Sequence, residues 1–302
     1  MARLHFWNAG HKPDDLTPEE HGFSTRGIAD GQGWHPPEEA ARGYIDIADA
    51  RAFAGSYADV LHALTHMHPR GEHSDSGAHR DMADWTSALV IAGENNRELE
   101  SFLRSLAAIG VVGSYAGGVA AYPEGSSRGE LQPAGAECIV LLAPGRTVTH
   151  NLHQVVDPSV IIETENERSV VTIEGKPAAR YYDDRRAGKY PDSDFEHLTI
   201  SDPAGRNVHL SPEPEDSGRL RIGAALPSGT AQLREVTEIA GPLEQAVAGS
   251  QLAFCCAGLG GAIERAPAGA NGPMVWMFGE IVDLGNGPEL GNLMISTWSS
   301  SR

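Results

Sequence analysis

The clearest candidates for chemistry in the first half of the chain lie in the stretch THMHPRGEHSDSGAH, residues 65–79. Imidazole nitrogens and carboxylate oxygens bind Zn²⁺ and related ions, and a His-x-His pair on an extended segment can present both rings to one ion. The flanking side chains are mostly charged or small and polar, so a solvated loop without a metal is the alternative. The candidate metal ligands are His66, His68, His73, Asp75 and His79.

A second pair of histidines, His150 and His153, follows the apolar run CIVLLAPG. Residues three apart share a face if the segment forms a helical turn. The two imidazoles are therefore candidates for a haem axial ligand or for an acid in a pocket, with surface or capping histidines as the alternative. The sequence contains no Cys-x-x-Cys-His motif, so a haem here would be held without covalent attachment.

The run FCCAGLGG near the C-terminus combines cysteine with glycines after an apolar segment. Glycines at such a position let backbone N–H groups approach a ligand, and ligands of α/β proteins bind beyond strand ends. Glu280 interrupts the apolar segment FGEIV, and a buried carboxyl group needs a partner or a ligand. A close-packed turn beside two buried thiols is the alternative. The predicted ligand-binding residues are Cys256, Gly258, Gly260, Gly279, Glu280 and Asn292, and Cys256 is also the candidate catalytic residue.

Composition narrows the class of protein that carries these residues. The chain has 302 residues, enough for about two domains, and its formal charge of −18 repels phosphate backbones and anionic lipid. We therefore expect neither nucleic acid nor membrane as a partner. The N-terminal residues contain no apolar run of signal-peptide length, so we expect a cytoplasmic protein. The three cysteines cannot form an even disulfide framework, which favours reduced and buried thiols.

The pattern of apolar residues predicts how these candidates are positioned. Residues 1–43 are rich in Gly, Pro and His and predict a long irregular arm, and residues 44–67 predict one or two helices. Residues 85–93 predict a buried strand. Asn95 and Glu98 form a capping-box pattern for a helix that Gly110 ends, and two further strands follow.

The second half of the chain repeats part of this order. Residues 159–177 predict a hairpin, a helix begins near Pro177, and short strands precede a short helix in GPLEQAVAG. Three more strands follow towards the C-terminus. We therefore expect a mixed α/β (α+β) fold, with two related α/β halves whose mixed sheets face each other and which arose by internal duplication. Chance similarity of spacing between α/β segments is the alternative.

The run VTHNLHQVVDPSVIIETENERSVVTIEGKPAARYYDD resembles the opening of the C-terminal FIST domain. FCCAGLGGAIE and GPMVWMFGEIVDLGNGPELGNLMIS resemble the cysteine-glycine loop, the Gly-Glu strand and the final Asn-bearing strand of that domain. Residues 88–122 are similar to the FIST N-terminal half. The resemblance divides the chain into an N-terminal arm with the histidine-rich loop (1–84), a FIST N-like half (85–150) and a FIST C-like domain (151–302).

The FIST resemblance implies a bacterial cytoplasmic sensor that binds a small-molecule ligand and acts in signal transduction. The chain contains no kinase, cyclase or receptor segment, so the signal would pass to a separate signalling protein. Haem is an implied cofactor, because some members of the family are associated with haem and nitric oxide. The alternative is an enzyme of specialised metabolism on the same scaffold, which would use Cys256, a histidine-bound Zn²⁺ or haem.

Overall fold

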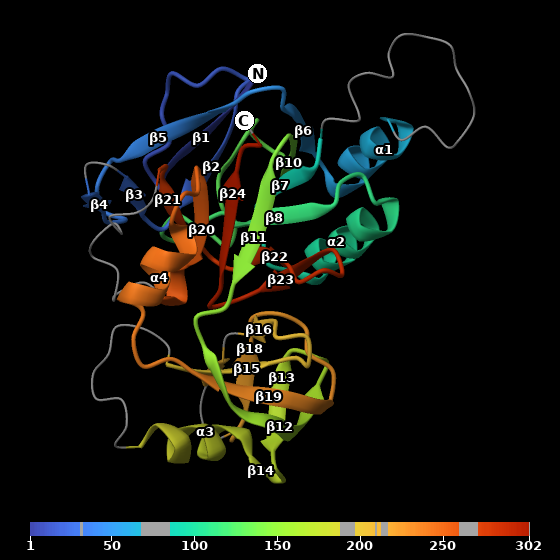
Figure 1. Cartoon of the computed structure of the whole chain (residues 1–302), viewed down its shortest axis with the longest axis vertical. Coiled ribbons are helices and arrows are strands. Elements are labelled where there is room, and N and C mark those ends of the chain that lie inside the picture. The colour runs from blue at the N-terminus through green and yellow to red at the C-terminus, as the bar shows by residue number, and fades with distance from the viewer. Residues whose placement is uncertain are drawn as a thin grey trace.

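The computed structural model describes residues 1–30, 33–67, 85–187, 197–208, 210–212, 217–259 and 271–301. In these residues the strands form four sheets, which we name A to D. Figure 1 shows a larger body, built from sheets A, B and C, above a smaller lobe built from sheet D and one helix. The helices and strands together confirm the predicted α/β class.

Sheet C is one layer of the body and has the strand order β23-β22-β8-β7-β10-β6. Strands β7 and β8 are parallel, and the other neighbours are antiparallel. The central strands SALVIA and CIVLLA are buried along their whole length, as expected for strands covered on both faces. The strands are β6 (Arg51–Gly55), β7 (Ser87–Ala92), β8 (Ser114–Val119), β10 (Cys138–Ala143), β22 (Glu280–Asp283) and β23 (Pro288–Gly291).

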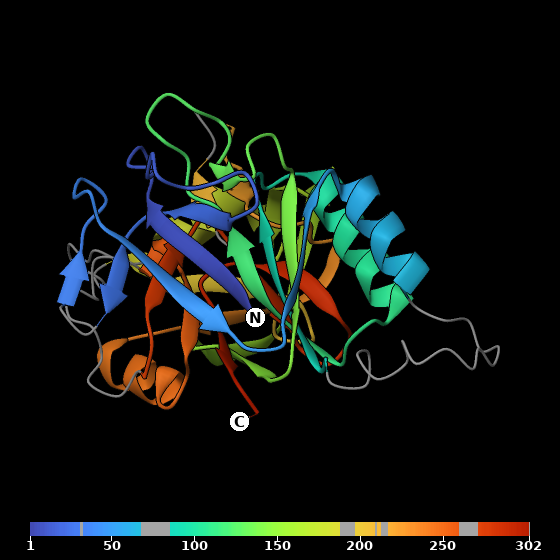
Figure 2. The same ribbon diagram turned by 90° about the horizontal axis from the view of Figure 1, so that it is seen from above.

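Two helices cover the outer face of sheet C, where Figure 2 shows them side by side. They are α1 (Tyr57–Met67) and α2 (Arg97–Ile109). Helix α2 begins after Asn96, whose side-chain oxygen accepts the N–H of Leu99 at 2.9 Å. It ends at Gly110, whose φ of 64° is readily reached by glycine. The predicted helix is confirmed, with its cap one residue later than the capping-box pattern placed it.

Sheet B is the second layer and has the order β11-β24-β20-β21-β3-β4. Its one parallel pair, among the strands described, is β20 with β21. Helix α4 (Ala240–Val247) packs against β24. The strands are β3 (Ile28–Asp30), β4 (Gly33–His35), β11 (Arg146–His150), β20 (Leu252–Cys256), β21 (Met274–Met277) and β24 (Ile295–Ser299).

Sheets B and C share one arrangement of strand directions. In both, a central parallel pair (β7 with β8, β20 with β21) is flanked on one side by two antiparallel strands and on the other by a hairpin. In each sheet, the hairpin and the central parallel pair come from opposite ends of the chain. Strands β3 and β4 complete sheet B, and β22 and β23 complete sheet C. The common arrangement agrees with internal duplication, which stays a prediction.

Sheet A forms from the N-terminal residues and has the order β5-β1-β2-β9. The prediction of an irregular arm over residues 1–43 was wrong, because β1 to β4 lie within it. The predicted helical segment 44–67 was partly wrong, since its first part forms strands and only α1 is helical. The strands of sheet A are β1 (Ala2–Asn8), β2 (His21–Thr25), β5 (Arg42–Ile47) and β9 (Leu131–Gln132).

Sheet D builds the smaller lobe, which the chain enters after β11 and leaves before α4. Strands β12 and β13 form the predicted hairpin, and α3 (Ala178–Arg186) begins after Pro177 as predicted. The strands are β12 (Gln154–Glu165), β13 (Ser169–Ile173), β14 (Lys176–Pro177), β15 (Leu198–Ser201), β16 (Asn207–Val208), β17 (Leu210–Pro212), β18 (Leu220–Ile222) and β19 (Gly229–Glu235).

Three clusters of buried apolar side chains hold these layers together. One lies between sheets A, B and C and includes Phe23, Ile91 and Phe254, so sheets B and C share a core. The second runs from α1 and α2 through sheet C into sheet D, and includes Leu103 and Val160. The third lies between sheet B and α4. The second cluster makes the lobe continuous with the body.

Candidate functional site

The carboxyl ends of the parallel strands of sheets B and C meet in one place. Phe278, which follows β21, donates its backbone N–H to the Val119 carbonyl at 2.9 Å, and Val119 donates to the Gly279 carbonyl at 2.9 Å. Val119 is the last residue of β8, and the next residue, Ala120, donates to Ala92 at the end of β7. Ligands of open α/β sheets bind beyond such strand ends. We name Cys256, Gly258, Gly279, Glu280 and Asn292 the strand-end site.

Glu280 is fully buried in the strand-end site. Its Oε2 accepts the N–H of Met294 at 3.4 Å, and the Cys256 thiol lies close enough to interact with the carboxyl group. Its Oε1 has no hydrogen bond of ordinary geometry among the described residues. Burial raises the pKa of Glu280 well above its usual value, because ionisation would leave a charge out of contact with water. Burial therefore favours the protonated form of the carboxyl group, which can donate one hydrogen bond.

Cys256 lies beside Glu280 at the end of β20, and both residues bond to the backbone of Met294, Glu280 to its N–H and Cys256 to its carbonyl. The Cys256 N–H donates to the Met294 carbonyl at 3.4 Å. Burial, followed by the neighbouring Glu280, raises the pKa of the Cys256 thiol well above its usual value, and backbone N–H groups of Leu293 and Gly258 partly oppose this shift. A protonated thiol is a poor nucleophile and a poor metal ligand. The predicted burial of all three cysteines as free thiols is confirmed.

Asn292 and two glycines close the strand-end site towards the lobe. Gly279 has a φ of 113°, and a Cβ there would lie 3.2 Å from Asn292 Nδ2. Gly223 belongs to the lobe, and a Cβ on it would lie 2.5 Å from Asn292 Oδ1. The Asn292 N–H also donates to the Asn207 carbonyl of β16 at 3.0 Å. The lobe therefore covers the strand ends, and glycine at 223 is needed for the close approach.

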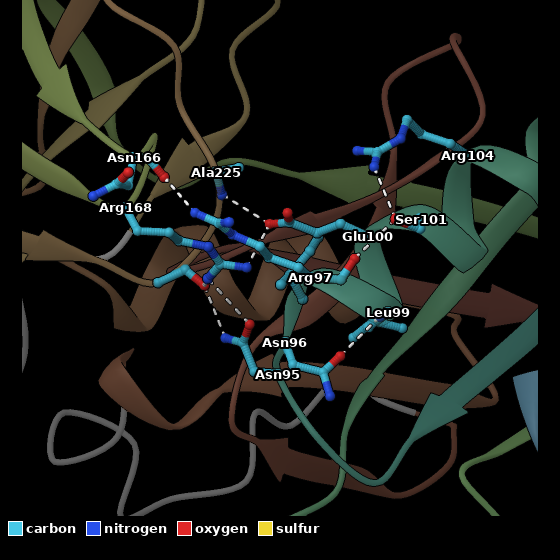
Figure 3. Close-up of polar contacts among 12 residues, drawn as sticks. Asn95, Asn96, Arg97, Leu99, Glu100, Ser101, Arg104, Asn166, Arg168 and Ala225 are labelled. Atoms are coloured by element: carbon cyan, nitrogen blue, oxygen red, sulfur yellow. Dashed lines mark hydrogen bonds and ion pairs between the residues drawn. The ribbon is translucent and has the colours of Figure 1, made fainter.

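A polar network anchors the lobe next to this site (Figure 3). Glu100 of α2 accepts hydrogen bonds from Arg168 Nη2 at 2.7 Å and from the Ala225 N–H at 2.8 Å. Arg168 Nη1 donates to the Gly223 carbonyl at 2.8 Å, and Asn95 Nδ2 donates to the same oxygen at 2.8 Å. The network ties the segment around Gly223 to the end of β7 and the start of α2.

The structure brings together five of the six residues predicted for ligand binding, and the sixth, Gly260, lies outside the described residues. Gly223 of the lobe and the Asn95–Arg168 network were not predicted. Only Gly223, which interrupts the predicted strand RLRIGAAL, gave a signal in the sequence. Nothing in local sequence indicates that an inserted lobe returns to cover the strand ends, because that contact joins residues far apart in the chain.

The predicted metal site is described only at His66, because His68, His73, Asp75 and His79 lie outside the described residues. His66 is in the last turn of α1, where its ring packs 4.0 Å from that of His62 and its Nδ1 lies 2.8 Å from the His62 carbonyl. Within the part of the chain that the structure describes, no group of three or more His, Cys, Asp or Glu side chains could hold a metal ion.

The predicted haem ligands do not lie on one helical turn. His150 is the last residue of β11, and His153 lies in the link to β12, with its carbonyl accepting Arg234 Nη1 at 3.0 Å. Burial lowers the pKa of His150, so its imidazole is neutral at neutral pH. His153 is buried. The expectation of a shared helical face was wrong, because β11 pairs with β24 up to His150. A haem at either residue stays a prediction.

No protein-family model matches the chain, and a search of curated proteins finds no match. The FIST resemblance therefore stays a prediction from the motifs. No helix among the described residues is long and apolar enough to cross a membrane.

Proposed function

We propose that this chain is a cytoplasmic small-ligand-binding sensor of the FIST type, which binds its ligand at the strand-end site and acts through a separate partner protein. Glu280 carries the proposal. A fully buried carboxyl group with an oxygen that lacks a protein partner costs stability unless it serves another purpose. A ligand with a hydrogen-bond acceptor would give the protonated Glu280 carboxyl group a partner.

Two further observations support binding at this place. The strand ends of both sheets and the lobe converge on it, and sites between such parts commonly hold ligands. The raised pKa of the Cys256 thiol favours binding over covalent chemistry, because the reactive thiolate is disfavoured. A catalytic role of Cys256, which the enzyme alternative needs, has correspondingly less support.

The proposal is tested by a thermal-shift screen of purified protein against a panel of small neutral and charged metabolites. We expect one chemical class to raise the melting temperature of the wild type, and mass spectrometry to recover that compound unchanged. Glu280→Met, which removes the hydrogen-bond donor, and Cys256→Ser should weaken the shift. Cys138→Ser is the matched control, because Cys138 is also a buried free thiol but lies in β10. Conversion of the compound to a product would favour an enzyme instead.

A further inference from the structure

A pocket lies on the outer side of sheet A, away from the strand-end site. It has a volume of about 530 Å³, which is in the range of pockets for small organic ligands. Strands β1 and β5 supply one wall, and the segment 13–20 supplies the other. Gly43 is part of the wall, and a Cβ there would lie 2.5 Å from the Phe6 ring, so the absence of a side chain at 43 lets Phe6 contribute to the pocket.

An exposed aromatic ring and a guanidinium group lie together in this pocket. Tyr44 is 55% exposed, and the Arg3 guanidinium lies 4.2 Å from the centre of its ring. Asp46 holds Arg3 in place through hydrogen bonds of 2.7 and 2.9 Å. The ring of His5 lies 5.9 Å from that of Tyr44. The Tyr44–Arg3 pair therefore offers an ordered surface on which a planar ring can stack.

The charged groups of the pocket differ in how firmly they are held. Glu20 accepts the Thr17 N–H at 2.7 Å and lies 3.1 Å from His5. Arg42 uses Nη1 to contact Asp15 at 2.8 Å, but these two side chains are 60% and 70% exposed. Such exposed ion pairs contribute little in water, and a guanidinium has five N–H donors suited to a carboxylate. Arg42 is therefore the side chain that can bind an anionic group of a ligand.

We infer that this pocket binds a small aromatic carboxylate, with its ring on Tyr44 and its carboxylate on Arg42 in place of Asp15. The apolar part of the lining, from Phe6, Pro13 and Leu16, fits an aromatic body. The lining holds two arginines and two carboxylates, and Arg3 is already held by Asp46, so a ligand carboxylate has to take the place of Asp15 on Arg42.

The test is equilibrium dialysis of the purified chain with 2-naphthoate. We expect saturable binding of one molecule per chain, and about tenfold weaker binding in Arg42→Gln, where a charge-assisted hydrogen bond is lost. Tyr44→Ala should weaken binding similarly, and Tyr44→Phe should retain it because the ring remains. The neutral 2-naphthylmethanol should bind at least about tenfold more weakly than the acid.

Arg51→Gln is the matched control, because Arg51 also lies over an aromatic ring, that of Phe53, but in β6. It should leave the binding of 2-naphthoate unchanged. Arg42 and Tyr44 are exposed, so circular dichroism should show both variants folded. The inference fails if the wild type shows no saturable binding, or if Arg42→Gln and Tyr44→Ala bind 2-naphthoate as tightly as the wild type. These results are independent of the strand-end site.

Discussion

Glu280 links the stability of the folded chain to pH. Burial raises its pKa well above the usual value of 4.5, so the folded chain keeps this proton after the unfolded chain has lost it. The unfolded state then binds fewer protons than the folded state, and the free energy of unfolding decreases as pH rises. Glu280 alone can lower the free energy of unfolding by up to about 1.4 kcal/mol per pH unit, between its pKa in the unfolded chain and its pKa in the folded chain.

Glu280→Gln removes this titration while keeping the shape of the side chain. We expect the variant to gain stability relative to the wild type as pH rises above about 4.5, because only the wild type loses free energy of unfolding through this carboxyl group. Urea unfolding of both proteins across this range measures the difference. A difference that is the same at every pH would show that Glu280 is ionised in the folded chain.

At the scale of single residues, the sequence predicted which groups are unusual but not what surrounds them. A glutamate within the apolar segment FGEIV is recognisable because charged residues are rarely buried without a purpose. The approach of Gly223 to Asn292 is not recognisable, because it depends on how the lobe folds back over the strand ends. The prediction that His150 and His153 share a helical face was wrong, because His150 lies in the edge strand β11 and not in a helical turn.

Helix α2 connects the body with the lobe through Glu100. The side chains of Glu100 and Arg168 are 10% and 23% exposed, so little water is available to replace a lost partner. Glu100→Ala should lower the free energy of unfolding by about 2–3 kcal/mol, because Arg168 and the Ala225 N–H each lose an acceptor. Chemical denaturation measures this loss.

Glu165→Ala is the control for Glu100→Ala. Glu165 also forms an ion pair with an arginine, Arg219, but both side chains are exposed. Loss of this ion pair should lower the free energy of unfolding by less than about 1 kcal/mol. Equal losses in the two variants would mean that the network in Figure 3 does not hold the lobe on the body.

At the scale of elements, long apolar runs and helix caps were predictable and short paired strands were not. Strands β7 and β10 are continuous apolar runs, and α2 has both a cap residue and a terminal glycine. Strands β1 and β2 contain few such signals. They become strands because they pair with each other and with β5 and β9, and pairing between distant segments overrides weak local preference.

The whole molecule has a core that does not stop at the boundary between body and lobe. One apolar cluster contains Leu103 of α2, Val140 of β10 and Val160 of β12. A lobe that shares its core with the body cannot unfold without exposing part of the apolar surface of the body. The visible division into two parts in Figure 1 therefore does not imply two units of stability.

We expect sheets C and D to unfold at the same denaturant concentration. Pulse-labelling hydrogen exchange with mass spectrometry can follow peptides from β10 and from β12 separately in one titration. The five tryptophans all lie outside residues 151–240, so their emission reports the body alone and serves as a check on the β10 peptides. Exchange of β12 at a clearly lower concentration would show that the lobe unfolds first.

The exchange of hairpins between the two ends of the chain affects how the protein folds as it leaves the ribosome. The edge of β8 pairs with β22, which is synthesised long after it. During synthesis the N-terminal part can therefore form its helices and central strands, but β8 keeps an unpaired edge of backbone N–H and C=O groups. Such edges can pair with other chains, so the nascent protein needs protection from its neighbours until the last strands emerge.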